Sequence, residues 1–200
     1  KPNIIDTVCE EIAPISHSST AIVSVAAGRR IESIATYFPD NQPVIRVMPN
    51  TPSSAMRGAI GAYANAFAGQ DQKALIEALI RPLGYFTWVD EEDMIDAVTA
   101  ISGSGPAYVF LFMEALRDAG KSLGLSDDIA RNLALQTISG AAALAEQDDN
   151  IPFEELRYNV TSPGGTTECG LAELLDDDAL KRLVQKAADS AYARAKDIAG

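Results

Sequence analysis

Strand and helix patterns are unevenly distributed along this chain, and this division constrains its fold more than any other feature. Apolar segments typical of buried strands occur only in the first ninety residues, where they alternate with helical segments. The expected strands are 20–27, 43–48, 58–65 and 85–89, and the expected helices around them are 3–13, 30–38 and 71–83. Near-continuous apolar strands separated by helices predict a mainly parallel sheet covered on both faces.

After Asp90 the strand signals stop, and we place a domain boundary near residues 90–95. The expected helices are 91–101, 105–123, 127–147, 152–159, 166–176 and 178–199. Ser126 followed by two aspartates is a typical N-cap with acids in the first turn. The alanine-rich helices suit either the interleaving of two subunits or a monomeric bundle, and the sequence favours neither.

Composition narrows the class of partner. Apolar residues make up 47% of the 200 residues and charged residues 22%, as in an ordinary globular protein. A net charge of −12 argues against nucleic acid and anionic membranes as partners. Cys9 and Cys169 are too few for a disulfide framework or a zinc site, and His17 is the single histidine. We therefore expect a cytoplasmic protein without a metal site, and no export signal is evident.

The most informative motif is Asn-Val-Thr-Ser-Pro-Gly-Gly-Thr-Thr-Glu at 159–168. Ser162 can cap a helix, and Pro163 suits its first turn because proline has no N–H to leave unpaired. Gly164 and Gly165 allow close approach of a ligand to the backbone. A helix N-terminus of this kind can bind a small carboxylate or phosphate, although a well-capped turn between two helices is an equal alternative.

Two further motifs accompany this loop: Val-Ile-Arg-Val-Met-Pro-Asn-Thr-Pro at 44–52 and Ser-Gly-Ser-Gly-Pro-Ala-Tyr at 102–108. The three motifs, in this order and at these separations, closely resemble those of the pyrroline-5-carboxylate reductases of proline biosynthesis. The resemblance extends over essentially the whole chain. It implies an incomplete Rossmann-like NAD(P)-binding domain over 1–92, of α/β class, followed by an all-α substrate-binding and dimerisation domain over 93–200. A Gly-x-Gly-x-x-Gly fingerprint is absent from the sequence, and in the family it lies before the position of Lys1.

The resemblance also implies a reaction and its partners. The family transfers a hydride from NADPH or NADH to the ring imine of Δ1-pyrroline-5-carboxylate and forms L-proline. A protonated imine accepts hydride readily, so catalysis by positioning needs neither a metal nor a histidine pair. The expected assembly is a homodimer or a larger homo-oligomer.

Residue roles follow from the same resemblance. The substrate carboxylate is expected at the backbone of the 164–167 loop, and the Thr167 hydroxyl at the ring nitrogen as the catalytic group. The expected substrate-binding residues are Glu92, Ser104, Ser162, Gly164, Gly165, Thr166 and Thr167. The expected cofactor-binding residues are Lys1, Pro2, Ala26, Ala27, Gly28, Asn50, Thr51 and Asn159.

Structural alternatives exist for three of these residues. Thr167 could cap a helix, Glu92 could serve as an acid in the first turn of a helix, and Ser104 could cap the helix that Pro106 opens. For the whole chain, one alternative is a non-catalytic dimerisation module that binds proline-like carboxylates. A different imine or β-hydroxyacid reductase is a third reading, which the position of Lys121 in the helical half disfavours.

Overall fold

The computed structural model describes residues 4–148 and 150–199, which form two compact units. The α/β unit comprises residues up to 106 together with those from 187 onward, and the helical unit comprises 107–186. Lys1 and Pro2, expected to contact the cofactor, lie outside the described residues.

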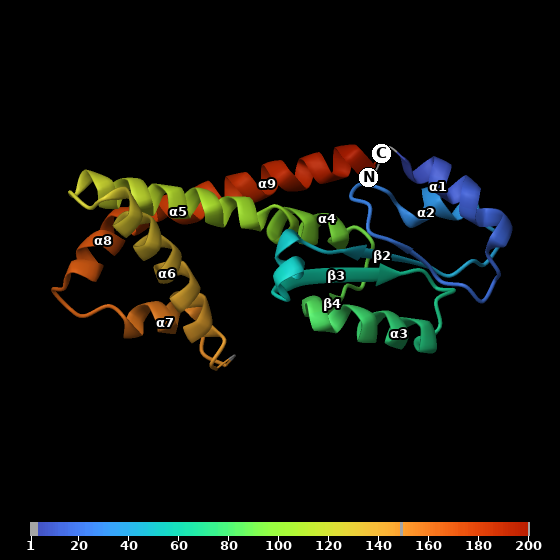
Figure 1. The fold of residues 1–200 in the computed structure, drawn as a ribbon, viewed down its shortest axis with the longest axis horizontal. Coiled ribbons are helices and arrows are strands. Elements are labelled where there is room, and N and C mark those ends of the chain that lie inside the picture. Colours follow the sequence, from blue (N-terminus) through green and yellow to red (C-terminus); the bar gives the residue numbers. More distant parts are fainter. Residues whose placement is uncertain (1–3, 149, 200) are drawn as a thin grey trace. The chain divides into compact units, whose positions relative to one another are not determined.

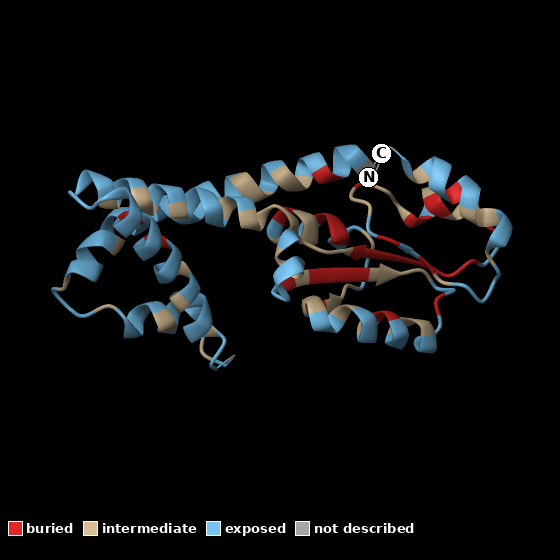
Figure 2. Ribbon diagram, in the orientation of Figure 1, coloured by how far each residue is buried: buried red, intermediate tan, exposed pale blue. Residues whose placement is uncertain are grey.

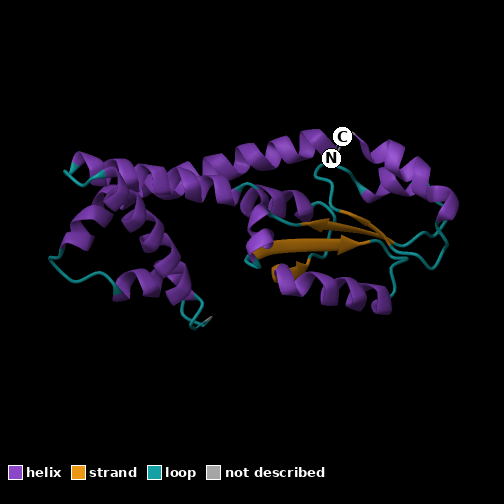
Figure 3. Cartoon of the chain, in the orientation of Figure 1, coloured by secondary structure: helices purple, strands orange, loops and turns teal. Residues whose placement is uncertain are grey.

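A four-stranded sheet organises the α/β unit, in the order β1 (Ile22–Ser24), β2 (Val44–Met48), β3 (Gly58–Ala64), β4 (Gly84–Trp88) (Figures 1 and 3). β1 and β2 pair in parallel, as do β3 and β4, but β2 and β3 are antiparallel. The sheet is therefore mixed, and the expectation of a mainly parallel sheet is wrong at this pair. Residues 49–57 hold only a 3₁₀ turn, η3 (Thr51–Ala55), and a parallel crossover needs a dozen or more residues.

Helices cover both faces of this sheet, as predicted. On one face α1 (Ile5–Ile12) and α2 (Ile31–Ala35) contribute Cys9, Ile31 and Ile34 to a core with Val44. On the other face α3 (Gln70–Ile80) packs over a second core, whose buried residues are Ile45, Val47, Ile60, Ala62, Ala68, Ile76 and Phe86. Alternate residues of β2 thus serve opposite cores, which explains why the strand is apolar almost throughout. Figure 2 shows β2 coloured as buried over most of its length.

A continuous helical stretch follows the sheet. It comprises α4 (Met94–Val98), a π turn (Thr99–Gly103) and α5 (Gly105–Ser122). α4 packs against β3 where Gly61 has no side chain, since a Cβ there would lie 2.7 Å from Val98 Cγ2. By length and composition alone, Met94–Ser122 could cross a membrane, and only 17% of its most apolar window is buried.

The helical unit contains the rest of α5, then α6 (Asp127–Ala145), α7 (Phe153–Asn159), α8 (Thr166–Leu175) and the start of α9 (Ala179–Ala199). Ser126 caps α6 as predicted, accepting a hydrogen bond from the Ile129 N–H. All the elements expected after residue 90 are helical, so the fold class of an α/β sheet followed by helices is confirmed. Within this unit the described buried apolar side chains are Ala130 and Ala134.

Candidate active site

The 159–168 motif forms the loop between α7 and α8. α8 begins at Thr166 with Gly165 as its N-cap, so Pro163 precedes the first turn instead of occupying it, contrary to the expectation. Gly164 adopts φ = 71°, a left-handed conformation that favours glycine. The backbone therefore turns at the glycine pair and presents the helix N-terminus at two threonines.

Two of the loop N–H groups are already bound within the chain. The Gly164 N–H donates to Glu168 Oε2 at 2.6 Å, and the Gly165 N–H donates to the Ser162 carbonyl at 3.0 Å. Thr166 and Thr167 are the first residues of α8, where an N–H has no acceptor inside the helix. The Glu168 carboxylate thus lies where a substrate carboxylate was expected, and sequence reasoning did not assign it a role.

The hydroxyl groups of this loop are accessible. Ser162, Thr166 and Thr167 are exposed, and Asn159 is the last residue of α7 and also exposed. The N-cap of α8 is Gly165 and Thr167 lies inside the first turn, so Thr167 is not the N-cap of this helix. The loop can accept a small anion at its backbone and offer a hydroxyl beside it.

In the α/β unit, Glu92 lies before α4 instead of in its first turn, and its carboxylate is held internally. Glu92 Oε1 accepts hydrogen bonds from Arg46 Nη1 and from the Ile31 N–H, both at 2.7 Å. Arg46 is only 3% exposed although it lies on the apolar strand β2. The contact joins β2, the start of α2 and the segment before α4.

Asp96, one turn after Glu92, completes this cluster, which sequence reasoning missed. Asp96 is 1% exposed and its carboxylate lies 4.0 Å from Arg46 Nη2, with no hydrogen-bond partner among the described residues. Burial raises the pKa of Asp96, and Arg46 opposes this only in part. Two features of the sequence could have indicated this cluster. Arg46 stands within an apolar strand, and Glu92 and Asp96 are acids four residues apart.

Asn50 follows β2 and connects two elements through its amide. Its Nδ2 donates to the Ser102 carbonyl at 2.9 Å, and its Oδ1 accepts from the Ala59 N–H at 3.0 Å. The Ser102 carbonyl would ordinarily bond to the N–H four residues later, which Pro106 lacks. The side chain of Asn50 therefore satisfies a backbone group that proline leaves open.

Ser104 lies in the π turn of the Met94–Ser122 stretch. Its N–H donates to the Thr99 carbonyl five residues earlier, at 2.9 Å. Residues 102–105 are thus a widened turn of a continuous helix, and Ser104 has no role as the cap of a separate helix. Pro106 lies in the first turn of α5, as predicted.

Five of the residues expected to bind the cofactor, Ala26, Ala27, Gly28, Asn50 and Thr51, lie at one edge of the sheet. β1 and β2 are parallel with Ser24 opposite Arg46, so Ala26–Gly28 and Asn50–Thr51 follow strand ends on the same side. Ala26 and Ala27 are half-buried and have small side chains. Gly28 has φ = 67°, and an added Cβ would lie 2.2 Å from Ile198 Cγ2, so glycine is required there by packing as well as by conformation.

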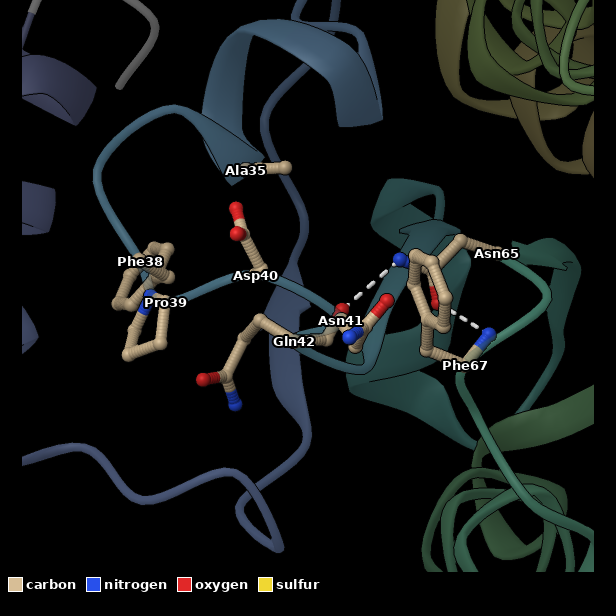
Figure 4. A pocket seen from close by; sticks show the side chains of 8 residues that line it. All are labelled: Ala35, Phe38, Pro39, Asp40, Asn41, Gln42, Asn65 and Phe67. Carbon is tan, nitrogen blue, oxygen red and sulfur yellow. Dashed lines mark hydrogen bonds between the residues drawn. The ribbon is translucent and has the colours of Figure 1, made fainter.

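A separate groove of about 410 Å³ lies at the opposite edge, where the chain enters β2 and leaves β3 (Figure 4). The side chain of Asn65 connects the two chain segments that line this groove. Its Nδ2 donates to the Gln42 carbonyl at 2.9 Å, and its Oδ1 accepts from the Phe67 N–H at 3.3 Å. None of the expected site residues lines this groove. In the described residues no cluster of three metal-ligating side chains occurs either.

The expected site residues are divided between the two units. Glu92, Ser104 and the cofactor edge belong to the α/β unit, and residues 159–167 belong to the helical unit. An α/β sheet whose parallel strands end at an edge with small residues, together with a separate helical unit, defines the class of two-part α/β proteins.

Comparisons with known proteins specify the family. The pyrroline-5-carboxylate reductase dimerisation family matches residues 92–198. A pyrroline-5-carboxylate reductase of Pseudomonas aeruginosa is 43% identical over 199 residues, covering 100% of this chain and 72% of the relative. One from Synechocystis is 38% identical over 99% of this chain and 72% of its own length.

Solved structures agree with these relatives. A pyrroline-5-carboxylate reductase of Coxiella burnetii has a TM-score of 0.94 at 42% identity, covering 100% of this chain and 73% of that one. A Plasmodium falciparum pyrroline carboxylate reductase with NADP bound has a TM-score of 0.87 at 34% identity, covering 100% and 79%. The chain belongs to the pyrroline-5-carboxylate reductase family.

Proposed function

We propose that this chain takes part in reduction of Δ1-pyrroline-5-carboxylate to L-proline with NADPH or NADH. The observation that carries the proposal is the Gly164–Thr167 loop, where a left-handed glycine turn leads directly into the N-terminus of α8. This end of a helix favours a negative charge, and the substrate bears one carboxylate.

In this proposal the loop holds the substrate and orients its ring. The N–H groups of Thr166 and Thr167 bind the carboxylate, and displacement of Glu168 frees the Gly164 N–H as a further donor. The Thr167 hydroxyl oxygen accepts a hydrogen bond from the N–H of the protonated ring imine. Because a threonine hydroxyl is a weak acid, the protonated imine itself brings the proton that the product amine retains.

The cofactor is proposed to lie at the edge formed by the ends of β1 and β2. Ala26 and Ala27 are half-buried and present no bulky side chain at this edge, and this is the observation that fits the group. When bound, NADPH or NADH supplies the hydride. Thr51, Asn159, Lys1 and Pro2 remain proposed contacts, whereas Gly28 and Asn50 also have the structural roles described above.

The remaining assignments are proposals of the same kind. Residues 1–92 would form the Rossmann-like part and 93–200 the substrate-binding and dimerisation part, and the family match at 92–198 supports the second of these. Homo-oligomers are the assembly the family match supports, and we propose a homodimer in the cytoplasm. Glu92, Ser104 and Ser162 complete the proposed substrate contacts.

Calorimetric titration with proline and NADPH, separately and together, tests the function. Proline binding that Thr167→Val weakens while Thr161→Val leaves it unchanged would support the loop assignment. The control is matched because the Thr161 hydroxyl donates to the Arg157 carbonyl and lies before the glycine turn. Binding of proline with no NADPH oxidation under any condition would favour the non-catalytic module, and absence of proline binding would refute the site.

A further inference from the structure

The groove where the chain enters β2 is a cavity that the proposed function leaves unused. Its volume of about 410 Å³ falls within the range of about 300–1,000 Å³ that small-molecule sites occupy. The turn 38–42 forms one side of it, and Asn65 with Phe67 forms the other. Figure 4 shows Asp40 and Phe67 on either side of Asn41. A ligand of this size would therefore lie between a carboxylate and an aromatic ring.

Hydrogen bonds hold both sides of the groove in place. Asn65 Oδ1 accepts from the Val44 N–H at 3.2 Å, and Asn65 Nδ2 donates to the Gln42 carbonyl. Within the turn, the Gln42 N–H donates to the Pro39 carbonyl at 3.2 Å, and Gln42 Nε2 donates to the His17 carbonyl at 3.1 Å. A groove whose walls are already fixed loses little conformational entropy when a ligand binds.

Two acceptor side chains of the groove have unpaired oxygen atoms. Asp40 is exposed, and within the described residues its carboxylate has no ion-pair or hydrogen-bond partner. Gln42 is only 2% exposed, and its buried Oε1 has no hydrogen-bond partner in the described part of the chain. Of the described lining residues, none is a lysine, arginine or histidine. The potential in the groove is therefore negative, in keeping with the net charge of −12.

Aromatic rings supply the apolar part of the lining. Phe67 is 51% exposed, whereas Phe38 is 8% exposed and belongs to the core beneath α2. The face of an aromatic ring attracts a cation, and a negative potential does the same. The two features together favour a positively charged group that carries an apolar body.

We propose that this groove binds a small organic ammonium, with the charged nitrogen at the Asp40 carboxylate and the apolar body extending toward Phe67. The carboxylate would repel an anion. A metal ion would find too few ligands, since no cluster of three metal-ligating side chains occurs in the described residues. The proposal goes beyond the proposed function, because none of the expected site residues lines the groove.

Titration of the full chain with 2-phenylethylamine, followed by amide NMR spectra, tests the proposal. We expect saturable shifts confined to the signals of 35–42 and 65–67, with a Kd on the order of 1–10 mM. The neutral analogue 2-phenylethanol has a hydroxyl in place of the ammonium and should bind at least about threefold more weakly. Equal Kd values for the two ligands, or the absence of saturable shifts, would overturn the proposal.

Variants of the groove locate the two ends of the ligand. Asp40→Asn and Phe67→Ala should each weaken amine binding by about threefold to fivefold. Asp71→Asn is the matched control, because Asp71 is an exposed acid in the first turn of α3 and does not line the groove. An equal loss in Asp71→Asn would mean that the negative chain attracts the amine without a specific site, and would overturn the proposal. Circular dichroism confirms that each variant is folded.

Proline separates this proposal from the proposed function. Proline carries a carboxylate beside its ammonium, so it should leave the groove signals unchanged. Competition between proline and 2-phenylethylamine for these signals would overturn the choice of ligand class. An amine that binds the groove of a chain that never binds proline would support this proposal and refute the proposed function alone.

Discussion

The α/β unit and the helical unit bury their apolar side chains to different extents. In the first, Val44, Ile45 and Val47 on one strand are at most 2% exposed. In the second, the described buried apolar residues are two alanines, and large side chains such as Phe110 and Leu133 are 59% and 53% exposed. The sheet supplies its own core, whereas the helices present apolar faces that another surface must cover.

The largest expected effect concerns the sheet core. Ile45→Ala should lower the free energy of unfolding by about 2–5 kcal/mol, because it leaves a cavity at a fully buried position. Leu133→Ala, measured at a concentration at which the chain is monomeric, should change this free energy by no more than about 0.5 kcal/mol. Urea titration followed by fluorescence of the single tryptophan, Trp88, and by circular dichroism reports both. Equal losses would show that the helical unit has a core of its own.

Protein concentration should affect the two units unequally. If the helical unit associates as a dimer, a hundredfold increase should raise its apparent free energy of unfolding by about 2.7 kcal/mol per dimer through mass action. The unfolding midpoint of the sheet, followed by Trp88 fluorescence, should change less, because the core of the sheet lies within one chain. Circular dichroism at 222 nm and fluorescence, recorded on the same samples, measure this difference. Coincident transitions that are independent of concentration would contradict the comparison.

Neutralising the two acids beside Arg46 should affect the free energy of unfolding differently. Glu92→Gln should lower it by about 1–3 kcal/mol, because Arg46 would remain buried beside a weaker acceptor. Asp96→Asn should be neutral or stabilising near pH 7, because the charged carboxylate has no hydrogen-bond partner among the described residues. Denaturant midpoints at pH 7 measure both changes.

The pH dependence of Asp96 follows from the direction of its pKa. Burial raises the pKa of the folded state above the ordinary value of 3.8, so the stabilising contribution is complete below pH 3.8. It is lost as the pH rises through the folded pKa. Asp96→Asn should remove this loss and flatten the pH profile above 3.8 relative to wild type. A wild-type contribution that increases with pH in this range would contradict the assignment.

A smaller effect is expected at the loop of the helical unit. Glu168→Gln removes the carboxylate that competes for the Gly164 N–H and should strengthen proline binding about twofold to fivefold. Glu173→Gln, later in the same helix, is the control. Calorimetry with proline measures both variants, and weaker binding by Glu168→Gln would mean that the carboxylate supports the site instead of competing for it.

The smallest effect is a difference in thiol reactivity with no change in fold. Cys9 is buried in the core beneath α1, and this burial, with the nearby Asp6, raises the pKa of its thiol. Cys169 is exposed in α8. Iodoacetamide at neutral pH should label Cys169 alone in the native protein and both after unfolding, as mass spectrometry can show. Rapid native labelling of Cys9 would show that the sheet core opens readily.

Local patterns in the sequence determined the elements and their order. The apolar runs at 43–48 and 58–65 and the capped helix after Ser126 predict strands and a helix close to the observed bounds. The 49–57 connection is too short for a parallel crossover, so the antiparallel pairing of β2 and β3 follows from its length. The apolar pattern of a strand does not indicate the strand's direction. Strand direction was therefore the part of the fold that the prediction missed.

The site residues show the same limit. Residue type and position in the chain suggested Glu92, Asn50 and the glycine loop as polar groups for ligands, because carboxylates, amides and helix N-termini all bind ligands. Hydrogen bonds across 46 and 52 residues of sequence decide how Glu92 and Asn50 are used. Such contacts depend on which elements become neighbours.

By itself, then, the sequence determined the succession of strands and helices, the glycine turn before α8 and the motifs that the reductase family shares. Only the tertiary structure decided that Arg46 meets Glu92 and Asp96, that Ile198 covers Gly28, and that a groove opens between Asp40 and Phe67. The physical reason is one of range. Backbone propensity and capping act within one or two turns, whereas burial, charge pairing and uncovered apolar surface arise between segments brought together by folding.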